Sequence, residues 1–231
     1  MTRRPASPRR GTWSDETRCH GALQVASLTV DLPHGQRLLG PLQFEVAPGE
    51  VLVLRGASGS GKSTILNWLA GARAPALQIS GSAWLGERRI DHLPAEKRHL
   101  GLMLQQDYLF PHMSVGDNLL FGLRGGTRRE RRQRVSDALA AAGLDGMASR
   151  TPASFSGGQH SRASLLRTLL SSPGALLLDE PFSSLDRDRR AQVRELVWCS
   201  AAHLPVLLVT HDVEDIPSHA RVVDLSNPTD T

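Results

Sequence analysis

The chain has 231 residues and a formal net charge of +4 at neutral pH, with 40% hydrophobic and 22% charged residues. This length allows one large domain, with or without a smaller subdomain, and predicts one catalytic unit rather than two. The composition is typical of a folded globular protein and argues against extensive disorder or a fibrous repeat. The longest apolar runs, such as Val206–Val209, are far shorter than the roughly 18 residues that a membrane-spanning helix needs. We therefore expect no transmembrane segment.

The first ten residues contain four arginines, a number equal to the net charge of the whole chain, so the remainder is formally neutral. This neutrality argues against a large nucleic-acid interface on the folded domain. We expect residues 1–20 to form a disordered basic tail. Paired arginines also occur in export signals, but Asp15 and Glu16 interrupt the apolar stretch that such a signal requires. Contact of the tail with anionic lipid headgroups is the remaining alternative.

Cysteine and histidine usage indicates neither a disulfide scaffold nor a zinc site. The chain contains only Cys19 and Cys199, with no C-x-x-C pair and no clustered histidine ligands. A reducing cytoplasm fits this pattern.

The first elements after the tail are expected to be strands. Apolar residues at 23–30 and at 42–46 predict half-buried antiparallel strands that form a small β-layer. The apolar run 51–54 predicts a further strand, and residues 62–69 have the spacing of a helix that stops at Gly71.

The middle of the chain reads as a short strand at 100–104 followed by helices at 114–123 and 127–142. The second helix begins with a run that holds five arginines between residues 128 and 134. Such a run is more often a solvated helix face than a binding surface, and we interpret it as solvated.

The last third alternates short apolar strands with helical stretches. Strands are predicted at 175–179 and 206–210, with a helix at 187–202 between them. This alternation predicts a parallel sheet covered by helices.

Residues 56–63 read Gly-Ala-Ser-Gly-Ser-Gly-Lys-Ser, which matches the phosphate-binding pattern G-x-x-x-x-G-K-[ST] between a predicted strand and a predicted helix. Glycines let backbone amides surround phosphate oxygens, and the following helix contributes its positive N-terminal end. Lys62 would neutralise β- and γ-phosphate charge, and Ser63 would supply a hydroxyl ligand for Mg²⁺. The residues expected to hold the nucleotide in this loop are Gly56, Ala57, Ser58, Gly59, Ser60, Gly61, Lys62, Ser63 and Thr64.

Two carboxylates, Asp179 and Glu180, close the strand at 175–179. Parallel sheets bind ligands at the carboxyl ends of their strands, so both side chains are expected to meet the nucleotide. A solvated acidic pair that merely caps a strand is the alternative, and the phosphate-binding loop upstream argues against it.

Between the phosphate loop and these carboxylates lies Phe-Ser-Gly-Gly-Gln at 155–159. This combination resembles the ATP-binding cassette (ABC) proteins, the motor subunits of membrane transporters, along almost the whole chain. The resemblance implies an α/β P-loop NTPase fold with a mostly parallel core sheet, a small antiparallel β-subdomain and a helical subdomain. It implies a single ATPase domain at 21–231, with the helical subdomain inserted at about 107–170.

The same resemblance assigns roles around the phosphates. Asp179 matches the acidic residue that holds Mg²⁺ directly or through water, Glu180 matches the catalytic base, and His211 matches the switch histidine that contacts the γ-phosphate. Gln105 matches the glutamine loop that orders Mg²⁺ and the attacking water and senses the transmembrane partner. Gln106 is the alternative for this role. Gln105 is preferred because a proline and a histidine follow it at six and seven residues, as is usual in the family.

The signature is expected to act on a second copy of the chain. Ser156 can cap a helix that continues through Leu169, while Gly157 and Gly158 let a phosphate approach its N-terminus. Gln159, the last residue of the signature, is also expected to bind the nucleotide. The family binds ATP between two subunits, so the resemblance implies a homodimer with two symmetric sites and places Asp186 in the loop that crosses this interface.

The sequence departs from the family pattern where an aromatic ring usually stacks on adenine. The corresponding neighbourhood, residues 32–35, has no Tyr, Phe or Trp. His34 can stack weakly, or the adenine can rest on aliphatic surface.

The resemblance implies an ATPase subunit that uses ATP and Mg²⁺ to power transport through separate transmembrane permease subunits. The run at 110–115 resembles import-type subunits that serve periplasmic solute-binding proteins. Such a subunit sits peripherally on the cytoplasmic face of the inner membrane, and no nucleic-acid partner is expected. The alternatives are the ATPase of an exporter or, as a weaker match, a non-transport ABC ATPase that acts on DNA. Members of that last group carry long coiled coils before the signature, and this sequence shows none.

Overall fold

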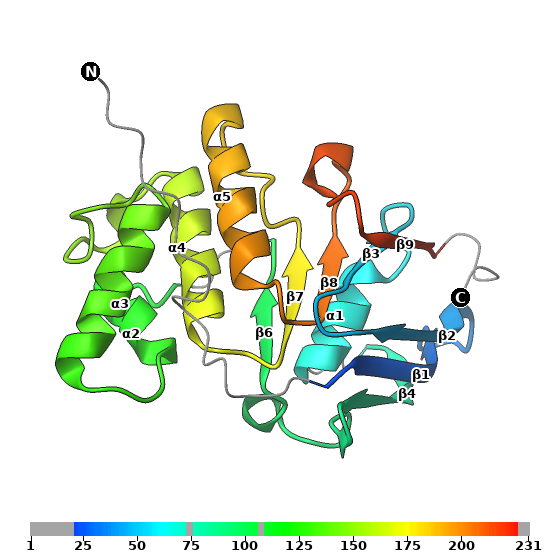
Figure 1. Ribbon diagram of the computed structural model, residues 1–231. Helices are drawn as coiled ribbons and strands as arrows, with labels where there is room; N and C mark the ends of the chain where they lie inside the picture. Colours follow the sequence, from blue (N-terminus) through cyan, green and yellow to red (C-terminus); the bar gives the residue numbers. More distant parts are fainter. Residues whose placement is uncertain (1–20, 73–75, 106–108, 226–231) are drawn as a thin grey trace. The chain divides into compact units, whose positions relative to one another are not determined.

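A computed structural model describes residues 21–72, 76–105 and 109–225 (Figure 1). The predicted basic tail, residues 1–20, and Gln106 lie outside the described residues. The chain forms two compact units. The sheet unit comprises the described residues of 19–106, 173–183 and 201–231, and the helical unit those of 107–172 and 184–200.

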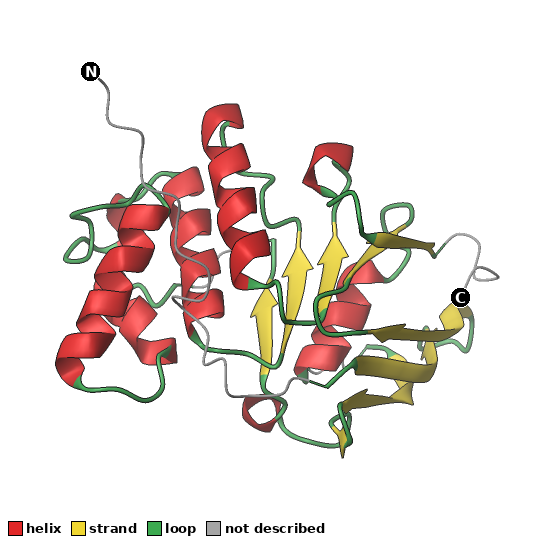
Figure 2. Ribbon diagram, in the orientation of Figure 1, coloured by secondary structure: helices red, strands yellow, loops and turns green. Residues whose placement is uncertain are grey.

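The sheet unit is built on a parallel sheet with strand order β6-β7-β8-β3-β9 (Figure 2). All four strand pairs are parallel. The central strands read as continuous apolar runs, which is typical of parallel strands covered on both faces. The predicted parallel core sheet is thereby confirmed. The strands are β3 (Val51–Arg55), β6 (Leu100–Met103), β7 (Ala175–Asp179), β8 (Val206–Val209) and β9 (Arg221–Asp224).

The second sheet of this unit is antiparallel and has the order β2-β1-β4-β5. The predicted strands at 23–30 and 42–46 correspond to β1 and β2, whose buried and exposed residues alternate. The sequence did not predict β4, because Ala83 is the only fully buried residue of that strand and no apolar alternation marks it. The strands are β1 (Leu23–Asp31), β2 (Arg37–Val46), β4 (Gln78–Leu85) and β5 (Arg88–Arg89).

Helix α1 (Lys62–Ala70) packs into the core that both sheets share. Ile65, Leu66 and Leu69 are fully buried there, on one helical face because of their spacing. The helix ends as predicted at Gly71, whose φ of 85° is the left-handed conformation that glycine adopts without strain. This packing fixes the direction in which the start of α1 points.

Arg98 holds the C-terminal end of α1 in place. Its side chain is 6% exposed, and its guanidinium donates to the carbonyls of Trp68 (2.6 Å) and Leu69 (2.8 Å), at the end of the helix. It also donates to the carbonyls of Leu93 (2.8 Å) and Asp91 (2.7 Å). A positive charge at the C-terminus of a helix also complements the helix dipole. One buried side chain therefore holds α1 to the segment that leads into β6.

The described residues of the helical unit form four α-helices, and a side chain caps the N-terminus of each. The caps are Ser114, Thr127, Ser156 and Asp186, each accepting a hydrogen bond from an amide in the first turn. Leu196 joins α5 to the apolar core of this unit, although the sequence suggested only that this helix covers the parallel sheet. The helices are α2 (Val115–Gly122), α3 (Arg128–Ala141), α4 (Gly157–Leu170) and α5 (Arg187–Ser200).

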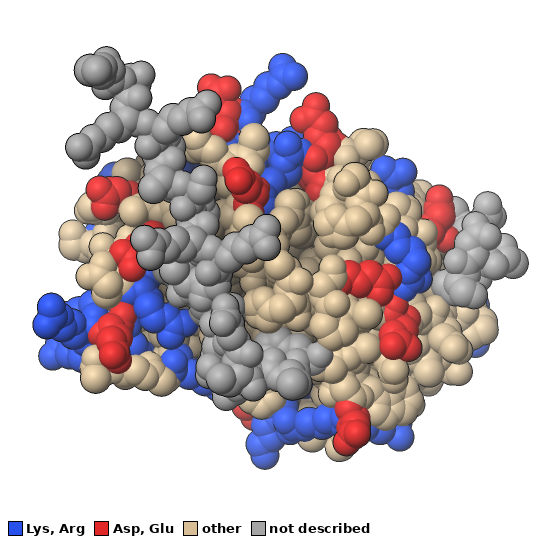
Figure 3. Space-filling model, in the orientation of Figure 1, with Lys and Arg blue, Asp and Glu red and all other residues tan. Residues whose placement is uncertain are grey.

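The arginine run lies on the first turns of α3, where positive side chains gather in Figure 3. Arg128, Arg129 and Arg132 are exposed, and the buried residues of this helix are Val135, Ala138 and Leu139. These arginines are exposed, and the interpretation of this surface as a solvated face stays a prediction.

Three short 3₁₀ helices complete the described residues, at Ala95–Lys97, Pro152–Ser154 and Val213–Asp215. Among the described residues, no helix is both long and apolar enough to cross a membrane.

Replacing Arg98 by alanine removes a buried guanidinium that donates to four backbone carbonyls and should lower the free energy of unfolding by about 2–4 kcal/mol. Urea denaturation followed by circular dichroism measures this change. Arg88→Ala is the matched control, because Arg88 is exposed on β5 and such a change should stay within about 0.5 kcal/mol. Equal, small effects of the two substitutions would contradict the anchoring role of Arg98.

Candidate nucleotide site

The register of the parallel sheet brings three predicted site segments of the sheet unit to one edge. Leu54 of β3 and Asp179 of β7 both pair with Val209 of β8. The phosphate loop, Glu180 and the segment Thr210-His211 therefore leave the sheet side by side. Gln105, which follows β6 on the other side of β7, also lies beyond this edge and is exposed.

The conformation of the phosphate loop requires its glycines. Gly56, Gly59 and Gly61 have φ values of 149°, 82° and 95°, which other residues adopt only with strain. A β-carbon on Gly56 would also lie 2.7 Å from Ser60 Oγ. The pattern read from the sequence therefore describes a loop that only these glycines allow.

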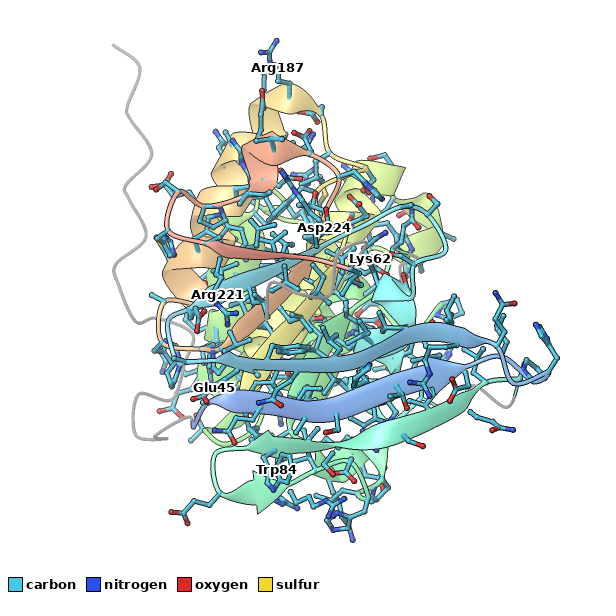
Figure 4. The ribbon with its side chains drawn as sticks, turned by 90° about the vertical axis from the view of Figure 1, so that its right-hand side faces the viewer. Glu45, Lys62, Trp84, Arg187, Arg221 and Asp224 are labelled. Carbon is cyan, nitrogen blue, oxygen red and sulfur yellow. The ribbon has the colours of Figure 1, made fainter. Side chains whose placement is uncertain are left out.

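Lys62 folds back over this loop at the start of α1 (Figure 4). Its Nζ donates to the carbonyls of Gly56 (2.7 Å) and Ala57 (2.8 Å) and lies 3.5 Å from Ser60 Oγ. No side chain among the described residues caps the N-terminus of α1, and its first turn contains no acidic residue. The positive end of α1 and the Lys62 ammonium thus act together on the loop, an arrangement suited to phosphate.

Ser63 and Asp179 meet, although they are far apart in the sequence. Ser63 Oγ donates to Asp179 Oδ2 at 2.7 Å, and Asp179 is 6% exposed. A hydroxyl and a carboxylate are oxygen ligands of the kind that Mg²⁺ prefers. Ser63 and Asp179, two of the three residues predicted to hold the metal, therefore fit Mg²⁺.

Glu180 is held directly beyond β7. Its Oε1 accepts a hydrogen bond from the backbone amide of His211 at 3.0 Å, and the His211 ring Nε2 lies 3.7 Å from the same oxygen. Burial raises the pKa of the Glu180 carboxyl, and the charges of Asp179 and Asp215 raise it further, whereas His211 opposes the rise. The backbone of Glu180 has a φ of 50°, a left-handed conformation that is costly for this residue type. A carboxyl group with a raised pKa, held in a strained conformation, is typical of a functional site.

Two residues of this site escaped the sequence analysis, Thr210 and Asp215. Thr210 is 2% exposed and Asp215 is 1% exposed, although both are polar. The Thr210 hydroxyl lies 3.2 Å from Asp215 Oδ2 and 3.4 Å from Glu180 Oε2. The sequence feature that could have pointed to Asp215 is its position four residues after His211, in the same short segment.

In the helical unit, the signature opens α4 with a capping box. Ser156 Oγ accepts from the amide of Gln159 at 3.3 Å, and Gln159 Oε1 accepts from the amide of Ser156 at 3.0 Å. The predicted cap at Ser156 is therefore present, with α4 ending at Leu170.

The two signature glycines have different surroundings. A β-carbon on Gly157 would meet nothing within 4 Å, so the position is open. A β-carbon on Gly158 would lie 3.1 Å from the carbonyl oxygen of Ser184, in the segment just before Asp186. Gly158 thus allows close packing of that segment, whereas Gly157 keeps the N-terminus of α4 uncovered.

Arg162 holds the signature helix in place, a role that the sequence did not reveal. The residue is 7% exposed and donates to the carbonyls of Gly158 (3.1 Å), Ala142 (2.7 Å) and Gly143 (3.3 Å). Burial lowers the pKa of its guanidinium, and the positive charge of Arg189 lowers it further. Arg162 therefore ties the start of α4 to the end of α3.

His34, the residue considered for adenine stacking, is exposed between β1 and β2. Its Nε2 lies 3.3 Å from Gln36 Oε1. Its contact with a base stays a prediction.

Residues 39–183 match the family model described as ABC transporter. The chain belongs to this family. It is 44% identical to the uncharacterized ABC transporter ATP-binding protein YnjD of Escherichia coli K12, over 88% of this chain and 95% of that protein. Membership in the family confirms the predicted class of ABC transporter ATPase.

Two further relatives carry the names of import proteins. The putative 2-aminoethylphosphonate import ATP-binding protein PhnT of Salmonella typhimurium is 41% identical, over 78% of this chain and 49% of that protein. The Fe(3+) ions import ATP-binding protein FbpC of Haemophilus influenzae 86-028NP is 38% identical, over 78% of this chain and 53% of that protein. The chain therefore spans about half the length of these two relatives.

The fold also matches solved ABC cassettes. The dimeric structure of MJ0796, described as a bacterial ABC transporter cassette, has a TM-score of 0.75 at 26% identity and covers 88% of this chain and 94% of that one. A post-hydrolysis state of the same cassette, bound to ADP and Pi, has a TM-score of 0.76 at 27% identity with the same coverage. These matches confirm the predicted P-loop NTPase fold.

Lys62→Ala removes the ammonium group that faces the phosphate loop of this ABC ATPase. We expect the Kd for ATP to rise at least about tenfold, because a charged hydrogen-bond donor to phosphate is lost. Isothermal titration with ATP measures the change. Lys97→Ala, at an exposed lysine far from the loop in the sequence, is the control. An unchanged Kd for Lys62→Ala would contradict the assignment.

The two signature glycines should respond differently to alanine. Gly157→Ala places its β-carbon in open space and should leave the free energy of unfolding unchanged or slightly higher, yet lower ATPase activity by about tenfold or more if a phosphate approaches there. Gly158→Ala should destabilise the fold by about 1–2 kcal/mol, because the Ser184 carbonyl must move. Thermal unfolding and ATPase assays on both variants separate the two effects. Full activity of Gly157→Ala would remove this residue from the site.

Proposed function

We propose that this chain hydrolyses ATP to power solute import through separate transmembrane permease subunits. The observation that carries the hydrolytic part is the convergence of the phosphate loop, Asp179 and Glu180 at one edge of the parallel sheet. Import is supported by the names of PhnT and FbpC, which describe import ATP-binding proteins.

Each side chain of the sheet unit has a separate task in this proposal. Lys62 and the amides of the phosphate loop bind the β- and γ-phosphates, and His211 contacts the γ-phosphate. Ser63 and Asp179 would hold Mg²⁺, with Gln105 as a further ligand. Bound Mg²⁺ neutralises phosphate charge and orients the γ-phosphoryl group for attack.

Glu180 is proposed as the general base. Its carboxylate accepts a hydrogen bond from the water that attacks the γ-phosphorus in line with the leaving oxygen. The raised pKa brings the carboxyl closer to neutral pH and makes it a better proton acceptor. The His211 amide holds Oε1, so the carboxylate keeps a fixed orientation.

The helical unit is proposed to serve the nucleotide of a second copy. Ser156, Gly157, Gly158 and Gln159 form the start of α4, whose positive end can approach a phosphate. Asp186 caps α5 through the amide of Arg189 at 2.9 Å, which fixes the loop assigned to the dimer interface. The dimeric MJ0796 cassette supports this arrangement. A dimer with twofold symmetry would contain two equivalent sites.

The remaining partners follow from the import proposal. Permease subunits would hold the dimer at the cytoplasmic face of the inner membrane, and a periplasmic solute-binding protein would deliver the solute. Purification of the chain with the permease subunits encoded beside its gene, followed by ATP-driven uptake into proteoliposomes, tests this part. ATP-driven uptake supports import, and ATP-driven efflux from the same vesicles would contradict it.

Glu180→Gln keeps the shape of the side chain but removes the base. We expect kcat for ATP hydrolysis to fall by about 100-fold or more, while the Kd for ATP stays within about threefold, because the phosphate loop is intact. The variant should accumulate as an ATP-bound dimer in size-exclusion chromatography with ATP and Mg²⁺.

Glu87→Gln, at an exposed position before β5, is the matched control and should hydrolyse ATP at the normal rate. Turnover by Glu180→Gln at the rate of this control would refute the base role.

A further inference from the structure

The Thr210 hydroxyl is a junction between Glu180 and a second, buried carboxylate. It accepts a hydrogen bond from the amide of Asp212 at 3.2 Å. It also lies 3.2 Å from Asp215 Oδ2 and 3.4 Å from Glu180 Oε2. A hydroxyl has a single proton to donate, so it cannot make a full hydrogen bond to both carboxylates.

Distance and burial both favour Asp215 as the acceptor. The contact to Asp215 is the shorter of the two. Asp215 is 1% exposed, whereas the Glu180 side chain is 13% exposed and nearer to solvent. A hydrogen bond to the more buried carboxylate competes less with water and is electrostatically stronger.

This choice of acceptor matters for Glu180. Its Oε1 already accepts from the His211 amide. If the Thr210 hydroxyl donated its proton to Glu180 Oε2 instead, both carboxylate oxygens of Glu180 would accept hydrogen bonds from the protein. The carboxylate would then bind the attacking water less well. With the proton on the Asp215 side, Oε2 stays able to accept a hydrogen bond from that water.

We propose that Asp215 is a positioning residue that draws the Thr210 hydroxyl proton away from Glu180 and so keeps Glu180 Oε2 available to the attacking water. Asp215 does not touch the nucleotide in this scheme, because it acts through Thr210. The inference rests on the proposed role of Glu180 as base.

Asp215→Asn tests the proposal, because it keeps the size of the side chain but removes the charge. Glu180 then becomes the only charged acceptor beside the Thr210 hydroxyl among the groups described here, and a charged acceptor binds a donor more strongly. We expect kcat for ATP hydrolysis by the full chain to fall by about tenfold, as one redirected hydrogen bond would produce. The KM and Kd for ATP should stay within about twofold, because the phosphate loop is unaffected.

A double-mutant cycle with Thr210→Val separates this mechanism from a general effect of Asp215. Without the hydroxyl there is no proton to redirect, so Asp215→Asn should lower kcat in the natural background but not in the Thr210→Val background. Thr210→Val alone should lose less kcat than Asp215→Asn. An equal loss in both backgrounds, as expected if Asp215 acts by its charge or by supporting the fold, would overturn the proposal, as would a normal kcat for Asp215→Asn.

Two controls and one replacement variant accompany this test. Thr168→Val makes the same change at a buried threonine of the helical unit, whose hydroxyl donates to the Ser164 carbonyl at 3.2 Å, and it should keep kcat within about twofold. If Asp215→Asn does not fold, as judged by circular dichroism, Asp215→Ser replaces it in the same cycle. Glu180→Gln is assayed in parallel: if it still turns over, the base assignment itself fails, whereas an inactive Glu180→Gln beside a fully active Asp215→Asn refutes only the role of Asp215.

Discussion

The pairing of β8 with both β3 and β7 is the constraint on which the nucleotide site depends. Because all three strands are parallel and Val209 is the common partner of Leu54 and Asp179, the segments that follow them begin at the same level of the sheet. This strand pairing alone brings together the phosphate loop, the two carboxylates and His211. A slip of one residue in either pairing would move one of these groups along the sheet by about 3.3 Å. A shift of this size is enough to break a hydrogen bond. The apolar core around α1 therefore supports catalysis by fixing the register of these strands.

Local features were accessible from the sequence because they are encoded by a few neighbouring residues. Glycines at 56, 59 and 61 permit the loop conformation, and Ser156 with Gln159 forms the capping box of α4. Strands with continuous apolar runs, such as β7 and β8, were also predictable. Family resemblance added roles for Glu180 and His211, and those roles are still predictions.

Long-range features were not accessible in the same way. The bond between Ser63 and Asp179, the anchor formed by Arg98 and the junction at Thr210 each depend on how the sheet unit folds in three dimensions. Arg98 looks like an ordinary surface arginine in the sequence, because its partners are backbone carbonyls that any residue provides. β9 was missed since it is short and begins and ends with a charged residue. The sequence thus indicates which groups are present, while the pairing of strands determines which of them meet.

The left-handed backbone at Glu180 links the proposed role of this residue as base to the stability of the fold. A φ of 50° costs a residue with a side chain on the order of 1 kcal/mol, a cost that glycine avoids. The amide of Glu180 bonds to the Val209 carbonyl at 2.9 Å, and its own carbonyl accepts from Ser183, so this conformation is held on both sides. A glycine here would relax the turn but remove the proposed base. In the proposed mechanism this position therefore illustrates a trade-off between stability and activity, in which the most stable residue for the turn differs from the one that the chemistry requires.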